Sequence, residues 1–322
     1  MKSRLLNYGI AFLVILCLNF LLPRLMPGDP LQAIYGDEAL LQMTAETKAE
    51  ITARFGLDQP VWKQFGNYLW RLAQGDLGYS FYHKAAVSEV IAAHLPWTLL
   101  LVGSGLVLAT LAGIALGIES GWRRGSALDR GLLTFLMSAS GFPSFFLGIL
   151  LLLLFGVTLG WLPLQGARTA YGGLSGLPLV VDVLEHLVLP AGTLLLAFLP
   201  GMYLLSRNST VTVRGEPYIL TARAKGLPDW KVRYHHGART AMLPVVTATG
   251  LLFASRMITG ALFVEIVFSY PGMGSLIHNS LIARDYPVLQ GTLFVTTVLV
   301  LATNFGVDLL YRSLDPRVKD AR

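Results

Sequence analysis

The chain has 322 residues, of which 54% are hydrophobic and 14% charged, and its mean hydropathy is +0.58. Because an average soluble domain carries about 25% charged residues, this composition indicates an integral membrane protein. A net charge of +6 does not by itself indicate nucleic-acid binding, since cations clustered on one side of a membrane protein give the same total. With Cys17 as its one cysteine, the chain cannot form an intrachain disulfide.

The first apolar run covers residues 5–22 and follows the cations Lys2 and Arg4. A secretory signal peptide begins in the same way, but no small-residue cleavage site follows here and further apolar runs come later. We predict a retained first transmembrane helix within residues 1–26, with its N-terminus in the cytoplasm.

Residues 27–95 form a long polar segment in which acids outnumber cations, so we expect it to be extracytoplasmic. Residues 44–55 predict a capped helix, and residues 61–73 repeat apolar side chains at amphipathic spacing. The segment could pack as a small cap on the transmembrane helices or dock a soluble donor protein, and one surface could do both.

Five further apolar runs predict the remaining spans. They cover residues 97–118, 131–159, 186–206, 245–263 and 288–311. Pro143 predicts a kink in the third span, and Pro190 and Pro200 interrupt the fourth. The prediction is an all-α integral membrane protein with six transmembrane helices, both termini in the cytoplasm and a five-helix core over residues 96–322.

The charges of the connecting segments support this topology. Most of the 25 Lys and Arg residues fall in predicted cytoplasmic segments, and most of the 19 Asp and Glu residues fall in predicted external ones, which include residues 161–185 and 265–287. Short loops with this bias follow the positive-inside rule.

The loop over residues 207–244 is the largest polar feature predicted on the cytoplasmic side. Its cations are Arg207, Arg214, Arg223, Lys225, Lys231, Arg233 and Arg239, and they face only Glu216 and Asp229. Gly226, Leu227 and Pro228 should split the loop into two short helical pieces. A basic loop between apolar runs lies in water, where it could meet a partner protein or simply be solvated.

Residues 218–227 (YILTARAKGL) and 239–244 (RTAMLP) resemble the EAA loop of ABC-importer permeases, in the form typical of the dipeptide, oligopeptide and nickel group. Further stretches resemble the B-type transmembrane subunit of that group, in the same order. They are residues 25–30 (LMPGDP), 75–81 (GDLGYSF), 94–99 (HLPWTL), 268–274 (FSYPGMG), 284–291 (RDYPVLQG), 304–311 (NFGVDLLY) and 314–317 (LDPR). The resemblance covers nearly the whole chain.

The resemblance implies a permease subunit of an ATP-driven importer in the bacterial cytoplasmic (inner) membrane, working by alternating access. Peptides are the first expected cargo, and a nickel or other metal complex is the alternative. The implied partners are a homologous second permease in a heterodimer, two ATP-binding subunits and an extracytoplasmic substrate-binding protein. Because the sequence lacks the ATP-binding pattern GxxxxGK[ST], ATP and Mg are expected on the partner subunits.

The resemblance also implies which residues receive the motion of the ATPases. They are Tyr218, Leu220, Thr221, Ala222, Arg223, Ala224, Lys225, Gly226, Leu227, Leu243 and Pro244. Their small members suit close approach of a short helix to a partner groove. Pro244 would begin the fifth span rigidly, so that a push on the loop tilts that span.

The loop departs from the oldest form of the motif, which begins with Glu-Ala-Ala. The corresponding residues here are Leu220, Thr221 and Ala222, which puts in doubt any role for a carboxylate at that position. Glu216 is a candidate substitute.

Three polar residues at or near membrane depth, Arg256, Glu265 and Asp308, are candidates for a transport pathway or for contact with another subunit. Asp308 could instead pair with Arg312 one turn away. The histidines have no spacing suited to a metal site, and no set of nucleophile, base and orienting group predicts an enzyme.

Two other classes of protein compete with this reading. An ion-gradient-driven secondary transporter would need inverted repeats or convergent intramembrane charge, and the sequence has no clear inverted repeat. A structural membrane scaffold would not couple transport to ATP hydrolysis.

Overall fold

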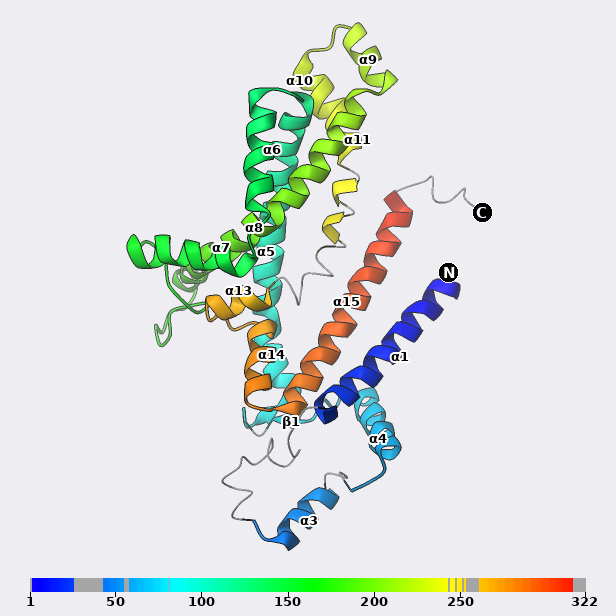
Figure 1. The fold of residues 1–322 in the computed structure, drawn as a ribbon, viewed down its shortest axis with the longest axis vertical. Helices are drawn as coiled ribbons and strands as arrows, with labels where there is room; N and C mark the ends of the chain where they lie inside the picture. The colour runs from blue at the N-terminus through cyan, green and yellow to red at the C-terminus, as the bar shows by residue number, and fades with distance from the viewer. Residues whose placement is uncertain are drawn as a thin grey trace. The chain divides into compact units, whose positions relative to one another are not determined.

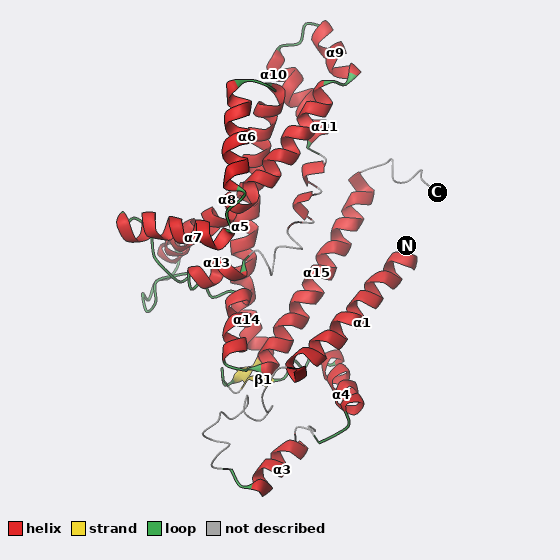
Figure 2. Ribbon diagram, viewed as in Figure 1, coloured by secondary structure: helices red, strands yellow, loops and turns green. Residues whose placement is uncertain are grey.

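The computed structural model describes residues 2–25, 43–54, 58–80, 82–242, 244–246, 248–250, 252 and 261–314. These residues are mostly helical (Figure 1), which confirms the predicted class. The β-structure among them is one antiparallel hairpin of two short strands, β1 (Tyr79–Ser80) and β2 (Ala85–Ala86), seen in yellow in Figure 2.

The chain divides into two compact units. The first comprises Met1–Pro96 and Gly272–Leu301, and the second Trp97–Pro271 and Ala302–Arg322. The predicted division at residues 26 and 95 stays a prediction, since it concerns the sides of the membrane rather than packing.

The first unit contains the N-terminal helices, the hairpin and parts of two long helices. Its elements are α1 (Lys2–Leu25), α3 (Ala45–Arg54), α4 (Val61–Ala73), the start of α5 (Val87–Trp122), α14 (Met273–Ile282) and the first part of α15 (Tyr286–Leu314). The hydroxyl of Thr44 accepts a hydrogen bond from the Thr47 N–H at 3.3 Å and so caps α3, as predicted. Phe65 and Tyr68 of the amphipathic α4 pack on Phe20 of α1.

A polar anchor joins the hairpin to the start of α15. The buried Ser80 hydroxyl donates to the buried carboxylate of Asp285, and Asp285 also accepts from the Val288 N–H at 3.3 Å. Ser80 in turn accepts from the His83 N–H at 2.9 Å. Two motifs that lie 205 residues apart are thereby held together within this unit.

The second unit contains the rest of α5 and the elements that follow it. They are α6 (Ala127–Ala139), α7 (Ser144–Leu151), the π-helix η1 (Leu152–Thr158), α8 (Leu177–Arg214), α9 (Pro217–Ala224), α10 (Asp229–Lys231), the π-helix η2 (Val232–Ala238), α11 (Arg239–Ala241) and α13 (Leu262–Val267).

Helices α5 and α8 approach closely along a row of glycines on α5. A Cβ atom added to Gly113 would lie 2.6 Å from the Met202 Cβ, and one added to Gly117 would lie 2.5 Å from the Ser206 Cβ. Small residues at four-residue spacing allow two membrane helices to pack with their backbones close together.

The predicted third span, residues 131–159, is bent close to Pro143, where the sequence predicts a kink, and that it forms one span stays a prediction. Helix α6 ends at Ala139, and the helix from Ser144 to Thr158 departs from it at 99°. The break has a local cause, because Pro143 has no N–H to continue α6 and disfavours the helical conformation of the residue before it.

The helix that contains the predicted fourth span, residues 186–206, is longer than that span. Helix α8 begins at Leu177, so residues 177–185 of the predicted external segment are helical, and it runs for 38 residues through Pro190 and Pro200 without a break. About 20 residues suffice to cross a bilayer, so α8 is long enough to extend beyond the membrane.

Among the described residues, three helices are long and apolar enough to cross a membrane: Val87–Trp122, Leu177–Arg214 and Tyr286–Gly306. The bent pair makes a fourth if it counts as one span, and a shorter apolar helix covers Tyr8–Leu21. Most of the predicted fifth span lies outside the described residues, so the number of six spans stays a prediction.

Candidate functional site

Within the predicted loop, residues 215–242 fold as two helical pieces that are separated at Gly226 to Pro228, as the sequence predicts. Helix α9 is followed by Gly226, whose φ of +77° is readily accessible to glycine, and Pro228 then precedes α10. The second piece continues from α10 through the π-helix η2 into α11. Residues 207–214 belong to the end of α8 instead.

Helix α9 has one buried face and one exposed face. Ile219 and Ala222 are buried against Trp122 of α5 and Val232 of η2. Ala222, which we expected to approach a partner, therefore packs within its own chain. The exposed face presents Tyr218, Leu220, Thr221, Arg223, Ala224 and Lys225.

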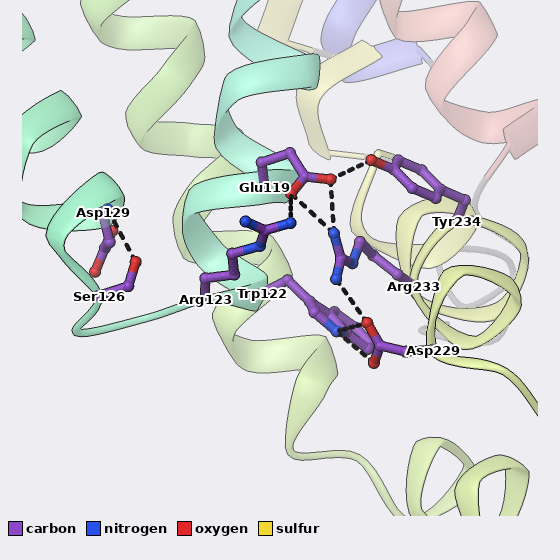
Figure 3. Close-up of polar contacts among 8 residues, drawn as sticks. All are labelled: Glu119, Trp122, Arg123, Ser126, Asp129, Asp229, Arg233 and Tyr234. Carbon is purple, nitrogen blue, oxygen red and sulfur yellow. Dashed lines mark hydrogen bonds and ion pairs between the residues drawn. The ribbon is translucent and has the colours of Figure 1, made fainter.

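A polar cluster fixes the second piece of the loop to the end of α5. We call it the Glu119 cluster, and it consists of Glu119, Trp122, Asp229, Arg233 and Tyr234 (Figure 3). The Nη1 of Arg233 donates to both carboxylate oxygens of Glu119 at 2.7 and 2.8 Å, and its Nη2 donates to Asp229 at 2.6 Å. The Trp122 indole N–H donates to Asp229 at 2.9 Å, and the Tyr234 hydroxyl donates to Glu119.

The environment of the cluster favours its ionised state. The Arg233 side chain is only 12% exposed, whereas those of Glu119 and Asp229 are 28% and 56% exposed. Partial burial would raise the pKa of Asp229, but hydrogen bonds from Trp122 and Arg233 outweigh it and hold that pKa below its ordinary value. The hydrogen bond to Glu119 raises the pKa of the Tyr234 hydroxyl, so this group stays protonated as a donor.

A second ionic contact binds Arg207 of α8 to Asp129 of α6. The Arg207 Nε and Nη2 donate to the two oxygens of Asp129 at 2.6 and 2.9 Å. The buried Ser120 hydroxyl adds a hydrogen bond to Asp129 at 2.5 Å. Arg207 and Arg233, which the sequence presents as cations of a solvated loop, are therefore both paired with acids of the same chain.

The remaining cations of the loop differ in their surroundings. Arg223 lies over the Trp122 ring, 5.2 Å from its centroid, and Lys231 lies 5.6 Å from the centroid of the Trp230 ring. Glu216 precedes α9 as its N-cap residue without a side-chain capping hydrogen bond, and its role in place of the missing carboxylate stays a prediction.

Of the three residues predicted for a pathway or a subunit contact, Glu265 is the one whose side chain the structure describes. Glu265 is fully buried in α13 and accepts a hydrogen bond from the Thr98 hydroxyl at 2.6 Å. The backbone of Asp308 belongs to α15, but its side chain lies outside the description, as do Arg256 and Leu243. Pro244 is described and exposed. No group of three or more His, Cys, Asp or Glu side chains that could hold a metal occurs among the described residues.

Sequence reasoning did not identify Glu119 and Trp122 as part of this site. One local signal was available, because Asp229 and Arg233 stand four residues apart, as do Glu119 and Arg123, which also pair. Nothing in the sequence indicates that Arg233 binds Glu119, because 114 residues separate the two in the chain.

Comparison with known proteins identifies the family. Residues 109–320 match the family described as the binding-protein-dependent transport system inner membrane component, and residues 1–102 match the N-terminal part of such membrane components. The chain belongs to the ABC-importer permeases of the peptide and nickel group.

Two similar permeases extend over almost the whole chain. A putative peptide transport system permease protein of Brucella abortus (strain 2308) is 38% identical over 307 residues, which cover 95% of this chain and 94% of that protein. A glutathione transport system permease protein of Salmonella choleraesuis (strain SC-B67) is 38% identical over 317 residues, which cover 98% and 97%. This permease is thus an integral inner-membrane component of an importer that works with other subunits.

Proposed function

We propose that this permease translocates peptides and that α9 is the element through which it receives the motion of its ATP-binding subunits. One observation carries the second part: α9 is anchored by Ile219 and Ala222 while Leu220 on its other face is 60% exposed. A short helix held on one side with an apolar residue exposed on the other is suited to enter a partner's groove.

Peptides are the proposed cargo because the similar permeases are named for peptide and glutathione transport. A nickel complex is the alternative, since the motifs resemble both branches of the group. Specificity would lie mainly with the extracytoplasmic binding protein that delivers the cargo. Identifying the ligand that copurifies with the cognate binding protein decides between a peptide and a metal complex.

The proposed assembly contains this permease, a homologous second permease, two ATP-binding subunits and the binding protein. ATP and Mg bind the ATP-binding subunits, and six spans place both termini of this chain in the cytoplasm. Residues 27–95 face the binding protein. Binding of the loaded donor and of ATP then biases the transmembrane helices between inward-facing and outward-facing states.

The coupling role of α9 can be tested at Leu220. A Leu220→Asp variant places a charge on the exposed face of α9 without altering its buried face, and Leu220→Met keeps an apolar side chain as the matched control. We expect both variants to insert in the membrane, with Leu220→Asp losing at least ten-fold in copurification of the ATP-binding subunits. Wild-type binding by Leu220→Asp contradicts the proposal.

The energy source can be tested separately in proteoliposomes. Uptake should require the ATP-binding subunits and ATP, with no uptake driven by an ion gradient across vesicles that contain the permease subunits alone. Gradient-driven uptake by this chain alone would identify a secondary transporter instead.

A further inference from the structure

The Glu119 cluster connects the loop to α5 by a route that does not pass through the predicted fifth span. The expected route runs along the chain from the loop through Leu243 and Pro244. The cluster instead joins Asp229, Arg233 and Tyr234 of the loop to the end of α5 (Figure 3). Helix α5 contains the second predicted span.

The polar half of this connection has a fixed geometry. One guanidinium binds two carboxylates, that of Glu119 on α5 and that of Asp229 on α10. Because a guanidinium is planar and its N–H directions are set, these hydrogen bonds restrain the orientation of Arg233 as well as its distance from each acid. Helix α10 and η2 are consequently held in one position relative to α5.

The apolar half of the connection depends on Trp122. Its indole N–H binds Asp229, while its ring packs in the same cluster as Ile219 and Ala222 of α9. The ring also packs closely against η2, because a Cβ atom added to Gly237 would lie 2.9 Å from the Trp122 Cζ3. One side chain of α5 therefore contacts or packs with α9, α10 and η2.

Close packing continues from this end of α5 to α8. A Cβ atom added to Gly121 would lie 2.7 Å from the Arg207 carbonyl oxygen and 2.8 Å from the Thr210 Cβ. Interiors packed this closely transmit a displacement instead of absorbing it. We therefore expect the end of α5 to move together with the end of α8 and with the loop.

We infer that Glu119, Trp122 and Arg233 are positioning residues that pass a displacement of α9 to the end of α5. This inference rests on the proposed function of α9 as the coupling helix. When an ATP-binding subunit moves α9, the Trp122 contacts and the Arg233 bridge carry α5 with it. The second predicted span thereby receives the motion directly.

The test measures motion at the end of α5 in the complete importer. Arg124 is exposed just beyond α5, so an Arg124→Cys reporter in a Cys17→Ser background allows labelling by a maleimide with and without ATP. In the assembled complex we expect ATP to change the labelling rate. Glu119→Gln and Arg233→Gln should each reduce this ATP-dependent change at least five-fold, while ATPase binding and basal hydrolysis stay within two-fold of wild type.

The matched control is Arg123→Gln. Arg123 also pairs with Glu119, at 3.3 Å, but its side chain is 54% exposed and it contacts Glu119 from the same helix. Its loss should leave the ATP-dependent change within two-fold of wild type. The double variant Glu119→Gln with Arg233→Gln should be no worse than either single variant, since both remove the same connection.

Several results would overturn the inference. An undiminished ATP-dependent change in both single variants would show that α5 receives its motion elsewhere, and loss of ATPase binding would show that the cluster only shapes the loop. If neither charge variant accumulates in the membrane, Tyr234→Phe decides, because it removes a single hydroxyl donor to Glu119. We expect it to reduce the change at least two-fold, and no reduction contradicts the inference. The Leu220 variants test docking of the ATP-binding subunits independently. A failure of the proposed role of α9 can therefore be told from a failure of the inferred transmission to α5.

Discussion

Arg233 Nη1 lies 2.7 and 2.8 Å from the two carboxylate oxygens of Glu119, although 114 residues separate them in the chain. This contact changes the picture of the loop that the sequence suggests. The second helical piece of the loop is bound to α5 by this contact. Both helical pieces still present exposed side chains, among them Leu220 of α9 and Trp230 of α10.

The close packing of α5 on α8 predicts a large difference between two glycines of α5. In a Gly117→Ala variant the new Cβ would meet the Ser206 Cβ at 2.5 Å and the Arg207 backbone nitrogen at 2.8 Å, whereas a Cβ at Gly103 has nothing within 4 Å. Because the backbone of α8 must shift, we expect Gly117→Ala to cost about 1–3 kcal/mol. Thermal unfolding of the detergent-purified protein measures this, with Gly103→Ala as control. Equal stability of the two variants contradicts the predicted packing.

The contact between Asp129 and Arg207 predicts strong destabilisation when its charge is removed. Their side chains are only 4% and 14% exposed, so an Asp129→Asn variant leaves a guanidinium largely buried without its counter-ion. Removing one partner of a buried pair costs about 3–5 kcal/mol of stability. Because Arg207 keeps some exposure, we expect Asp129→Asn to cost an amount near the lower of these values. Unfolding measurements should compare Asp129→Asn with Glu185→Gln, an exposed acid of α8. The prediction fails if the two variants are equally stable.

The anchor between Ser80 and Asp285 predicts that the hairpin loosens when Asp285 is replaced. An Asp285→Ala variant removes the acceptor of the buried Ser80 hydroxyl and of the Val288 N–H, and a buried donor left without a partner costs about 1–3 kcal/mol. We expect faster limited proteolysis between residues 74 and 86. Asp58→Ala, at an exposed acid of the same unit, is the control. Unchanged cleavage in Asp285→Ala would show that the anchor does not hold the hairpin.

The pairing of Asp229 with Arg233 predicts a pH-dependent contribution to stability. Because the pKa of Asp229 is lowered from 3.8 in the folded protein, the carboxylate stabilises the fold above its ordinary pKa, and the effect is lost as pH falls through the lowered value. Asp229 is largely exposed, so its pairing should contribute only about 1 kcal/mol. The difference in unfolding free energy between wild type and Asp229→Asn should be constant from pH 5 to 7 and shrink below pH 4. A difference that grows on acidification has the wrong sign.

Some features of the fold follow from local sequence. Helices α3 and α4 were predictable because capping and amphipathic spacing act within one or two turns. The split of the loop at residues 226–228 was predictable for the same reason, since Gly and Pro restrict their own backbone. Pro143 also predicts an irregularity in the third span, but the sequence does not predict the 99° angle between the two helices. A proline identifies where a helix is interrupted, whereas the direction of the next helix depends on what it packs against.

What the sequence by itself determined is the class of protein, the family and the approximate position of α9, because composition, apolar periodicity and local motifs carry that information. Only the tertiary structure decided that Ala222 faces inward, that Arg207 and Arg233 are paired, and that Glu119 and Trp122 bind the loop. Each of these facts depends on contacts between segments far apart in the chain. Charge and size at single positions do not reveal such contacts, because an exposed cation and a paired one have the same residue type.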